Sequence, residues 1–272
     1  MTTANRESRL VNALNLEEKD LPDSLDRIYH RRRKSVLGVV LRFAARHALT
    51  KGMVAYYIDK DVAGFKQWFY VASKVKLASA GQPGGEAFNM RSPLQYALLS
   101  DNAEVIDAMA RVTTKALHDA DVNSLANQFH VRMLQLAILG DDEALRIRIQ
   151  KLAKHGKNPD RKAAAAGRDF YTLLLNRDKA ALEDLIQNKD SKVISSDVLF
   201  EDFMSSMGVW ETKLCWRRGL EVQIDSPLVP MELMPVRPLE HYDDVYDFLK
   251  PGWVPPPQGL LADAVRWIRK RV

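Results

Sequence analysis

Four short polar turns interrupt helical stripes of apolar residues at intervals of roughly 40 residues, and this spacing constrains the fold more than any other feature. In each turn a side-chain oxygen precedes the next stripe, where it can accept a hydrogen bond from an unpaired backbone N–H group. The turns lie at residues 58–61, 99–102, 139–142 and 175–178. The sequence therefore predicts an all-α protein of helical hairpin repeats, a solenoid-like fold that presents extended surfaces to partners.

The apolar stripes between the turns indicate where the core lies. One helix is expected over residues 25–49, with arginines on its outer side. Phe65, Trp68 and Phe69 recur at three- and four-residue steps, and we interpret them as core. Ser92 is expected to cap a further helix that begins with a proline. The inward stripe of the first helix is predicted to contain Ile28, Val36, Val39, Val40 and Phe43.

The character of the chain changes after residue 220, because four prolines between positions 227 and 238 prevent a continuous helix. Apolar residues alternate with these prolines, so we expect an extended proline-rich tail that packs along the helices. A short helix over 242–249 and a final helix after the prolines at 255–257 are expected to follow. The predicted organisation is an N-terminal segment (1–24), a helical repeat-like domain (25–220), and a tail with a C-terminal helix packed on that domain (221–272).

Composition and the first residues favour a cytoplasmic location. The chain begins without a basic cap followed by a long apolar stretch, so no signal peptide is expected. The longest early apolar run, residues 36–41, is too short for a membrane span of about 20 residues, and no membrane partner is predicted. Cys215 is the only cysteine and lies between Leu214 and Trp216, which favours a buried, inert thiol.

No sequence motif assigns a catalytic, cofactor-binding or metal-binding residue. The six histidines form no HExxH pair, and the glycine-rich loop at 81–85 lacks the lysine of a phosphate-binding loop. Asp101, Asp141, Asp142 and Asp178 each follow a helix, and a capping role fits that position better than acid–base catalysis. The sequence therefore predicts a protein that is not an enzyme and holds no cofactor, with an all-helical enzyme as the remaining third alternative.

Charge is unevenly distributed along a chain whose net charge is +5. Residues 1–60 hold twelve bases against seven acids, whereas residues 197–250 hold eleven acids against five bases. The basic run at 31–34 and the basic cluster between 151 and 168 are interpreted as solvated faces, since no aromatic residues interleave with the second cluster as base-stacking platforms would. Nucleic acid is therefore not the expected partner.

One acidic stretch of the tail also contains tyrosines, and this combination makes it the candidate partner-binding site. Carboxylates complement a basic partner surface, and tyrosine supplies contact area and a hydroxyl at little entropic cost. The alternative interpretation is an ordinary solvated cap and turn. The candidate residues, here called the tail patch, are Glu240, Tyr242, Asp243, Asp244, Tyr246 and Asp247.

Several of these features together resemble the immunity protein 49 family of bacterial polymorphic-toxin systems. They are the aromatic segment 65–72 (FKQWFYVA), the repeated Leu-x-x-Asp helix turns, and the tail segment 225–230 (DSPLVP) with Tyr242 and Tyr246. The resemblance covers most of residues 35–250. It implies an all-helical protein, encoded beside a secreted toxin, that binds and neutralises this toxin inside the producing or a neighbouring cell. Toxins of such systems are often nucleases or other enzymes that act in the cytoplasm. The family supplies no catalytic residue.

Two functional hypotheses follow. The first is an immunity protein that forms a stoichiometric inhibitory complex with a cognate toxin. The alternative is a helical-repeat adaptor or regulatory scaffold whose protein partner is not a toxin. The isoelectric point of about 9.2 contrasts with nuclease inhibitors, which are often acidic. Either only the acidic region engages the toxin, or inhibition works away from the toxin's active site.

Overall fold

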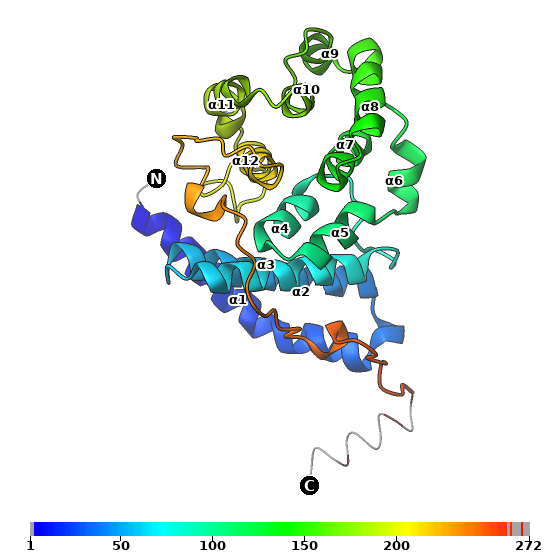
Figure 1. The fold of residues 1–272 in the computed structure, drawn as a ribbon. Helices are drawn as coiled ribbons and strands as arrows, with labels where there is room; N and C mark the ends of the chain where they lie inside the picture. The colour runs from blue at the N-terminus through cyan, green and yellow to red at the C-terminus, as the bar shows by residue number, and fades with distance from the viewer. Residues whose placement is uncertain (1–2, 260–261, 263–267, 269–272) are drawn as a thin grey trace.

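The computed structural model describes residues 3–259, 262 and 268, and every regular element over these residues is helical (Figure 1). The predicted all-α class is confirmed. The α-helices are α1 (Thr3–His30), α2 (Leu37–Tyr57), α3 (Val62–Ser79), α4 (Ser92–Ser100), α5 (Ala103–Arg111), α6 (Lys115–Ala120), α7 (Asn127–Leu139), α8 (Asp142–His155), α9 (Asn158–Ala165), α10 (Phe170–Leu175), α11 (Lys179–Asn188) and α12 (Gly208–Arg217). Four short 3-10 turns are η1 (Arg32–Lys34), η2 (Asp190–Lys192), η3 (Met231–Leu233) and η4 (Asp247–Leu249).

Successive helices pack on one another along most of the chain. The helices α1, α2 and α3 form a layer at one end of the molecule, and α4 and α5 pack on α3 (Figure 1). The chain then continues through α7 and α8 to α9, α10 and α11 at the other end. Helix α12 returns to pack against α4 and α11. A segment late in the sequence is thereby placed beside α4, which lies in the first half of the chain.

The four predicted turns all carry the expected helix caps. Each cap side chain accepts a hydrogen bond from a backbone N–H group in the first turn of the following helix, which satisfies one of the unpaired donors there. The caps are Asp61 for α3 (2.9 Å), Asn102 for α5 (2.9 Å), Asp141 for α8 (3.1 Å) and Asp178 for α11 (3.1 Å).

Three other predicted caps are wrong. Ser92 is already the first residue of α4, and the side chain of Arg91 at the preceding position makes no capping bond. Asp101 ends α4 in a left-handed conformation with φ of +59° and is buried. Asp142 belongs to α8 and forms an ion pair with Arg218 at 2.8 Å. For Ser92, the helix begins one residue earlier than predicted. For Asp101 and Asp142, ion pairs with distant residues override the local preference for a helix cap.

The helix predicted over 25–49 is two helices. Helix α1 runs through Pro22 and ends at His30, and α2 begins at Leu37. The basic run at 31–34 therefore lies in the connection, where Arg31 pairs with Asp23 at 2.5 Å and with Asp26 at 2.6 Å. Proline lacks the N–H that a helix interior needs, but packing of α1 along α2 outweighs this local cost.

The predicted core of α3 is confirmed. Phe65 and Phe69 are fully buried and stacked, with ring centroids 4.0 Å apart. Trp68 is only partly buried and packs edge-on against His47. Cys215 is buried as predicted, and this burial raises the pKa of its thiol. A buried neutral thiol is a weak nucleophile, so this cysteine serves packing.

The chain after α12 contains no α-helix over residues 218–259 and crosses α3 to reach the C-terminal end of α1 (Figure 1). The short helix predicted over 242–249 is reduced to the 3-10 turn η4. Val229, Leu233 and Met234 are buried in the core. The predicted final helix after residue 257 falls largely outside the described residues.

A buried charge cluster fixes the start of this tail. Asp101 accepts ion pairs from Lys66 at 2.9 Å and from Lys213 at 2.7 Å. The Lys213 ammonium also donates to the carbonyl of Leu233 at 2.7 Å, and Lys66 donates to that of Arg237 at 2.7 Å. Burial lowers the pKa of Lys213 to about 8, and Asp101 opposes that change. The cluster therefore joins α3, α4, α12 and the tail, and it depends on all three charges.

Candidate functional site

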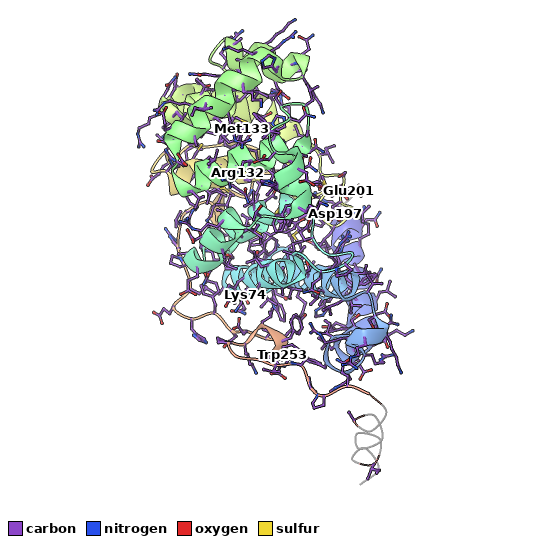
Figure 2. All side chains as sticks on the ribbon, turned by 90° about the vertical axis from the view of Figure 1, so that its right-hand side faces the viewer. Lys74, Arg132, Met133, Asp197, Glu201 and Trp253 are labelled. Carbon is purple, nitrogen blue, oxygen red and sulfur yellow. The ribbon has the colours of Figure 1, made fainter. Side chains whose placement is uncertain are left out.

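The tail patch is divided between side chains that point inward and side chains that reach solvent. The Tyr242 hydroxyl donates to the carbonyl of Ser100 at 2.6 Å. The Asp244 carboxylate accepts a hydrogen bond from the Tyr70 hydroxyl at 2.9 Å and pairs with Lys74 at 2.6 Å. Figure 2 shows Lys74 on the side of α3 that the tail crosses. These contacts hold the tail on the helices.

Tyr246 is also directed into the protein. It is buried, and its hydroxyl lies 2.9 Å from His47 Nδ1. Burial, and then the neighbouring Lys51 ammonium, lowers the pKa of His47 from 6.5 to about 4, so the imidazole is neutral at physiological pH. The members of the tail patch that are exposed are Glu240, Asp243 and Asp247. Half of the patch is thus available to a partner.

A different region of the surface is hollowed and more open to a partner. Two cavities, of about 420 Å³ and about 580 Å³, adjoin one another over α2, α4, the loop after α3 and the loop before α12. They share the lining residues Asn89, Met90, Ser92, Tyr96 and Asp197. We call the two together the groove. It joins segments that lie more than 100 positions apart in the sequence.

One face of α2 forms a wall of the groove. Val39, Arg42, Phe43 and Arg46 follow one another at helical spacing and line the cavity. The prediction that Val36, Val39 and Phe43 belong to the core is wrong, because the opposite face of α2 packs inward through Leu41, Ala44, Ala45 and Ala48. Phe43 is instead 64% exposed.

The loop after α3 forms a second wall, and close backbone packing holds it in place. The Gly38 N–H of α2 donates to the carbonyl of Pro83 at 3.1 Å, and a Cβ atom on Gly38 would lie 2.2 Å from the backbone nitrogen of Gly85. Glu86 pairs with Lys76 at 2.8 Å. Burial alone would raise the pKa of Glu86, but Lys76 and other donors lower it. The loop is thus anchored on α2.

The loop before α12 forms the third wall. Arg46 pairs with Asp197 at 2.7 Å, which ties the loop to α2. The Ser205 hydroxyl donates to the carbonyl of Asp190 at 2.6 Å, and an antiparallel bridge joins Ser205 to Ile194. Figure 2 shows Asp197 beside α1, where Arg9 also reaches this loop through Glu201 at 3.0 Å. All three walls of the groove are held by interactions within the fold.

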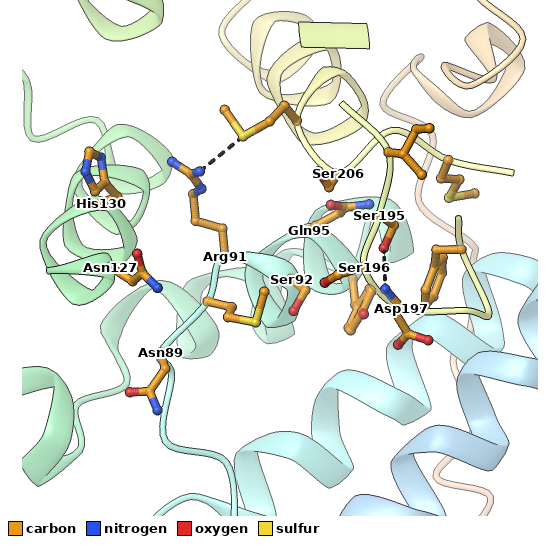
Figure 3. A pocket seen from close by; sticks show the side chains of 16 residues that line it. Asn89, Arg91, Ser92, Gln95, Asn127, His130, Ser195, Ser196, Asp197 and Ser206 are labelled. Carbon is orange, nitrogen blue, oxygen red and sulfur yellow. Dashed lines mark hydrogen bonds between the residues drawn. The ribbon is translucent and has the colours of Figure 1, made fainter. Parts of the chain in front are cut away.

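Arg91 and His130 close one end of the groove (Figure 3). The Arg91 guanidinium donates to Met207 Sδ at 3.1 Å and lies over the Trp210 ring at 5.3 Å. Burial, and then the Arg91 charge, lowers the pKa of His130. The Arg91 guanidinium and the His130 imidazole therefore lie at this end of the groove, together with the amide of Asn127.

Behind Arg91 lies a smaller cavity of about 80 Å³ that contains Glu211. Glu211 is fully buried, and neither carboxyl oxygen has a hydrogen-bond partner among the described residues. Burial, and then the carboxylate of Asp190, raises the pKa of Glu211 well above its usual range. Burial and Asp190 thus disfavour the charged form of Glu211, whereas the nearby Arg91 charge favours it.

The described residues contain no group of three or more histidine, cysteine, aspartate or glutamate side chains placed to hold a metal ion. Over the same residues, none of the helices has the length and apolar character needed to cross a bilayer. The groove is lined by apolar, amide, hydroxyl, imidazole and charged side chains of both signs, a mixture that is common at protein–protein interfaces.

Comparison with known proteins identifies the family. The family described as Immunity protein 49 matches residues 18–233 of the chain. This chain belongs to the immunity protein 49 family. The resemblance predicted from the sequence is confirmed, and membership implies toxin immunity through binding of a cognate toxin. No curated protein and no solved structure matches the chain.

The extent of the family match separates the two candidate surfaces. All residues that line the groove, from Val39 to Met207, fall within residues 18–233. The tail patch lies beyond the match, although the sequence resemblance was predicted to reach residue 250. The groove thus lies within the matched part of the chain, and the tail patch does not.

Sequence reasoning missed the groove residues. The helical spacing of Phe43 predicts a core position, and no sequence pattern assigns a role to Arg91. One available signal was the apolar content of α2, which exceeds what a single buried face needs and so indicates a second, exposed apolar face.

Proposed function

We propose that this chain is the inhibitor of one cognate toxin, which it neutralises by forming a stoichiometric complex. The observation that carries the proposal is the family match over residues 18–233, which includes an anchored groove with an exposed apolar rim. Immunity proteins as a family are generally not enzymes. The inhibition is accordingly ascribed to binding and not to chemistry performed by this chain.

The finer parts of the proposal concern the toxin. We propose that it belongs to a polymorphic-toxin system, is encoded by the adjacent gene, is secreted by a type VI system, and acts in the cytoplasm as an enzyme such as a nuclease. The inhibitor then works in the cytoplasm, where it meets the toxin.

The four capped hairpins support the related proposal of a divergent two-helix repeat as the scaffold.

The mechanism we propose is occlusion of the toxin's active site or of the path of its substrate. A few anchoring side chains in a desolvated centre dominate such interfaces, while the surrounding contacts exclude water. Two surfaces supply candidate anchors. One is the groove, and the other is the solvent-facing part of the tail patch, Glu240, Asp243 and Asp247.

Co-expression in bacteria with the product of the adjacent gene tests this function. The expected result is growth arrest by the neighbouring gene product alone, rescue by this chain, and purification of the two proteins as a complex of equal stoichiometry. A neighbour that is not toxic and forms no complex with this chain would contradict the proposal for that pair and would favour the adaptor hypothesis.

A further inference from the structure

The rim of the groove carries large apolar side chains that the fold leaves in solvent. Phe43 from α2, Met90 from the loop after α3, and Ile194 from the loop before α12 are 64%, 57% and 63% exposed. Single apolar side chains on a surface are common, but several around one depression mark a contact site. These three come from three different segments, so the fold itself assembles the rim.

The charges in the groove do not balance. Two of its four cations are neutralised, since Arg46 pairs with Asp197 at 2.7 Å and Lys76 pairs with Glu86 at 2.8 Å. Arg42 and Arg91 form no salt bridge with any residue that the structure describes. Arg42 lines one cavity and Arg91 lines the other. Each half of the groove therefore contains one cation with no carboxylate at salt-bridge distance, although Arg42 lies near Glu86 and Arg91 near Glu211.

Arg91 is partly desolvated, which increases the energetic value of a partner's carboxylate there. Its guanidinium is placed by Met207 Sδ at 3.1 Å and by the Trp210 ring at 5.3 Å. A charge in such an environment interacts with an opposite charge more strongly than an exposed one does.

The groove is also preformed. The Gly38–Pro83 hydrogen bond, the Lys76–Glu86 pair and the Arg46–Asp197 pair fix its three walls before any partner arrives. A rigid receptor avoids the entropic cost of ordering loops upon binding.

We propose that the groove receives an acidic segment of the cognate toxin. The toxin's carboxylates pair with Arg42 and Arg91, and its apolar side chains contact Phe43, Met90 and Ile194. This inference rests on the proposed function and specifies the partner's chemistry. It also accounts for a basic inhibitor, because the charge that the groove complements is negative.

The test is the affinity of the full chain for the toxin domain encoded by the adjacent gene, measured by titration calorimetry at two salt concentrations. Arg42→Gln with Arg91→Gln removes the two uncompensated charges. Lys151→Gln with Lys154→Gln is the matched control, because it removes two exposed charges of α8 outside the groove. We expect the groove variant to bind about 30-fold more weakly and the control to change less than about threefold.

A second variant removes the apolar contact without touching Arg91. Phe43→Ser with Met90→Ser alters two exposed side chains, so the fold is retained and affinity is expected to fall by about 30-fold. If the wild type binds the toxin and both groove variants bind as tightly as the control, the groove assignment is overturned and the proposed function stands. If the wild type does not bind the toxin, the proposed function fails, and the groove assignment fails with it.

The oligomeric state of the chain alone identifies the competing occupant. A wild-type dimer in solution that Phe43→Ser with Met90→Ser converts to a monomer would place a second copy of this chain in the groove and overturn the proposal. A monomeric wild type is the expected result.

Discussion

The tail patch and the groove are both surfaces of aromatic and charged side chains, but the fold treats them differently. In the tail patch, Asp244 is satisfied by Tyr70 and Lys74, and Tyr246 lies against His47. In the groove, Arg42 forms no salt bridge with any described residue, and Phe43 remains in solvent. The first set of side chains contacts the rest of the fold, and the second is the set that we propose the toxin contacts.

This difference shows that suitable chemistry alone does not define a binding site. Both sets are chemically suited to an interface, because tyrosine, arginine and carboxylates are common interface anchors. What distinguishes them is whether the fold already supplies the partner. The following predictions test this distinction, beginning with the largest expected effect on stability.

The buried cluster that anchors the tail is expected to give the largest effect. Asp101→Ala leaves Lys66 and Lys213 buried without a counter-charge, and such a loss typically costs about 3–5 kcal/mol. Urea denaturation measures the free energy of unfolding. The exposed Asp59→Ala is the control and is expected to change it by less than about 0.5 kcal/mol. A loss below about 1 kcal/mol for Asp101→Ala would show that the cluster does not hold the tail.

His47 makes attachment of the tail sensitive to acid. Its pKa is 6.5 when unperturbed and about 4 in the fold, so the unfolded chain takes up the proton first as the pH falls. The stability from neutral His47 is complete above pH 6.5 and is lost progressively toward pH 4, by about 3 kcal/mol.

The measurement is the free energy of unfolding between pH 7.5 and pH 4 for the wild type and for His47→Gln. The difference between the two curves gives the contribution of His47 to the pH dependence of stability, separate from that of the other titrating groups, including the nearby Lys51 and Glu18. Parallel curves would contradict the role assigned to His47.

Within the tail patch, Asp244 is expected to matter for stability and not for the toxin. Asp244→Ala removes the acceptor of Tyr70 and Lys74, and loss of a hydrogen bond to a charged group costs about 1.5 kcal/mol. Glu240→Ala, an exposed neighbour, is the control. If Asp244→Ala weakened toxin binding while thermal stability stayed at the wild-type value, the tail patch would be a contact surface.

The groove is expected to give the reverse pattern with the smallest change in stability. Phe43→Ser removes a side chain that is 64% exposed, so the free energy of unfolding should change by no more than about 0.5 kcal/mol. Toxin affinity should fall at the same time. Destabilisation by more than about 2 kcal/mol would mean that Phe43 belongs to the core, as its position in the α2 stripe first indicated.

The features that could be predicted from the sequence are those determined by residues that lie close together along the chain. Asp61 and Asp178 cap their helices because capping needs only an oxygen at the right position in the chain. The core assignment of Phe65 and Phe69 follows from helical spacing in the same way.

The parts that sequence missed depend on distant residues. Asp101 has the position of a cap, yet Lys66 and Lys213 determine its role. Phe43 has helical spacing suited to a core, but the other face of α2 is the one that packs. The groove required three segments to meet, and no local pattern specifies that meeting. The helical pattern and the tail patch both predicted a protein partner, but neither located the groove.

The most direct test of the central claim is site-specific photo-cross-linking in the complex with the adjacent-gene toxin. A photoreactive phenylalanine analogue is placed at position 43 in the groove and, separately, at position 243 in the tail patch, since Phe43 and Asp243 are both exposed. We predict a covalent product with the toxin from position 43 and none from position 243. Efficient cross-linking from position 243 with none from position 43 would contradict the account and would place the toxin on the tail.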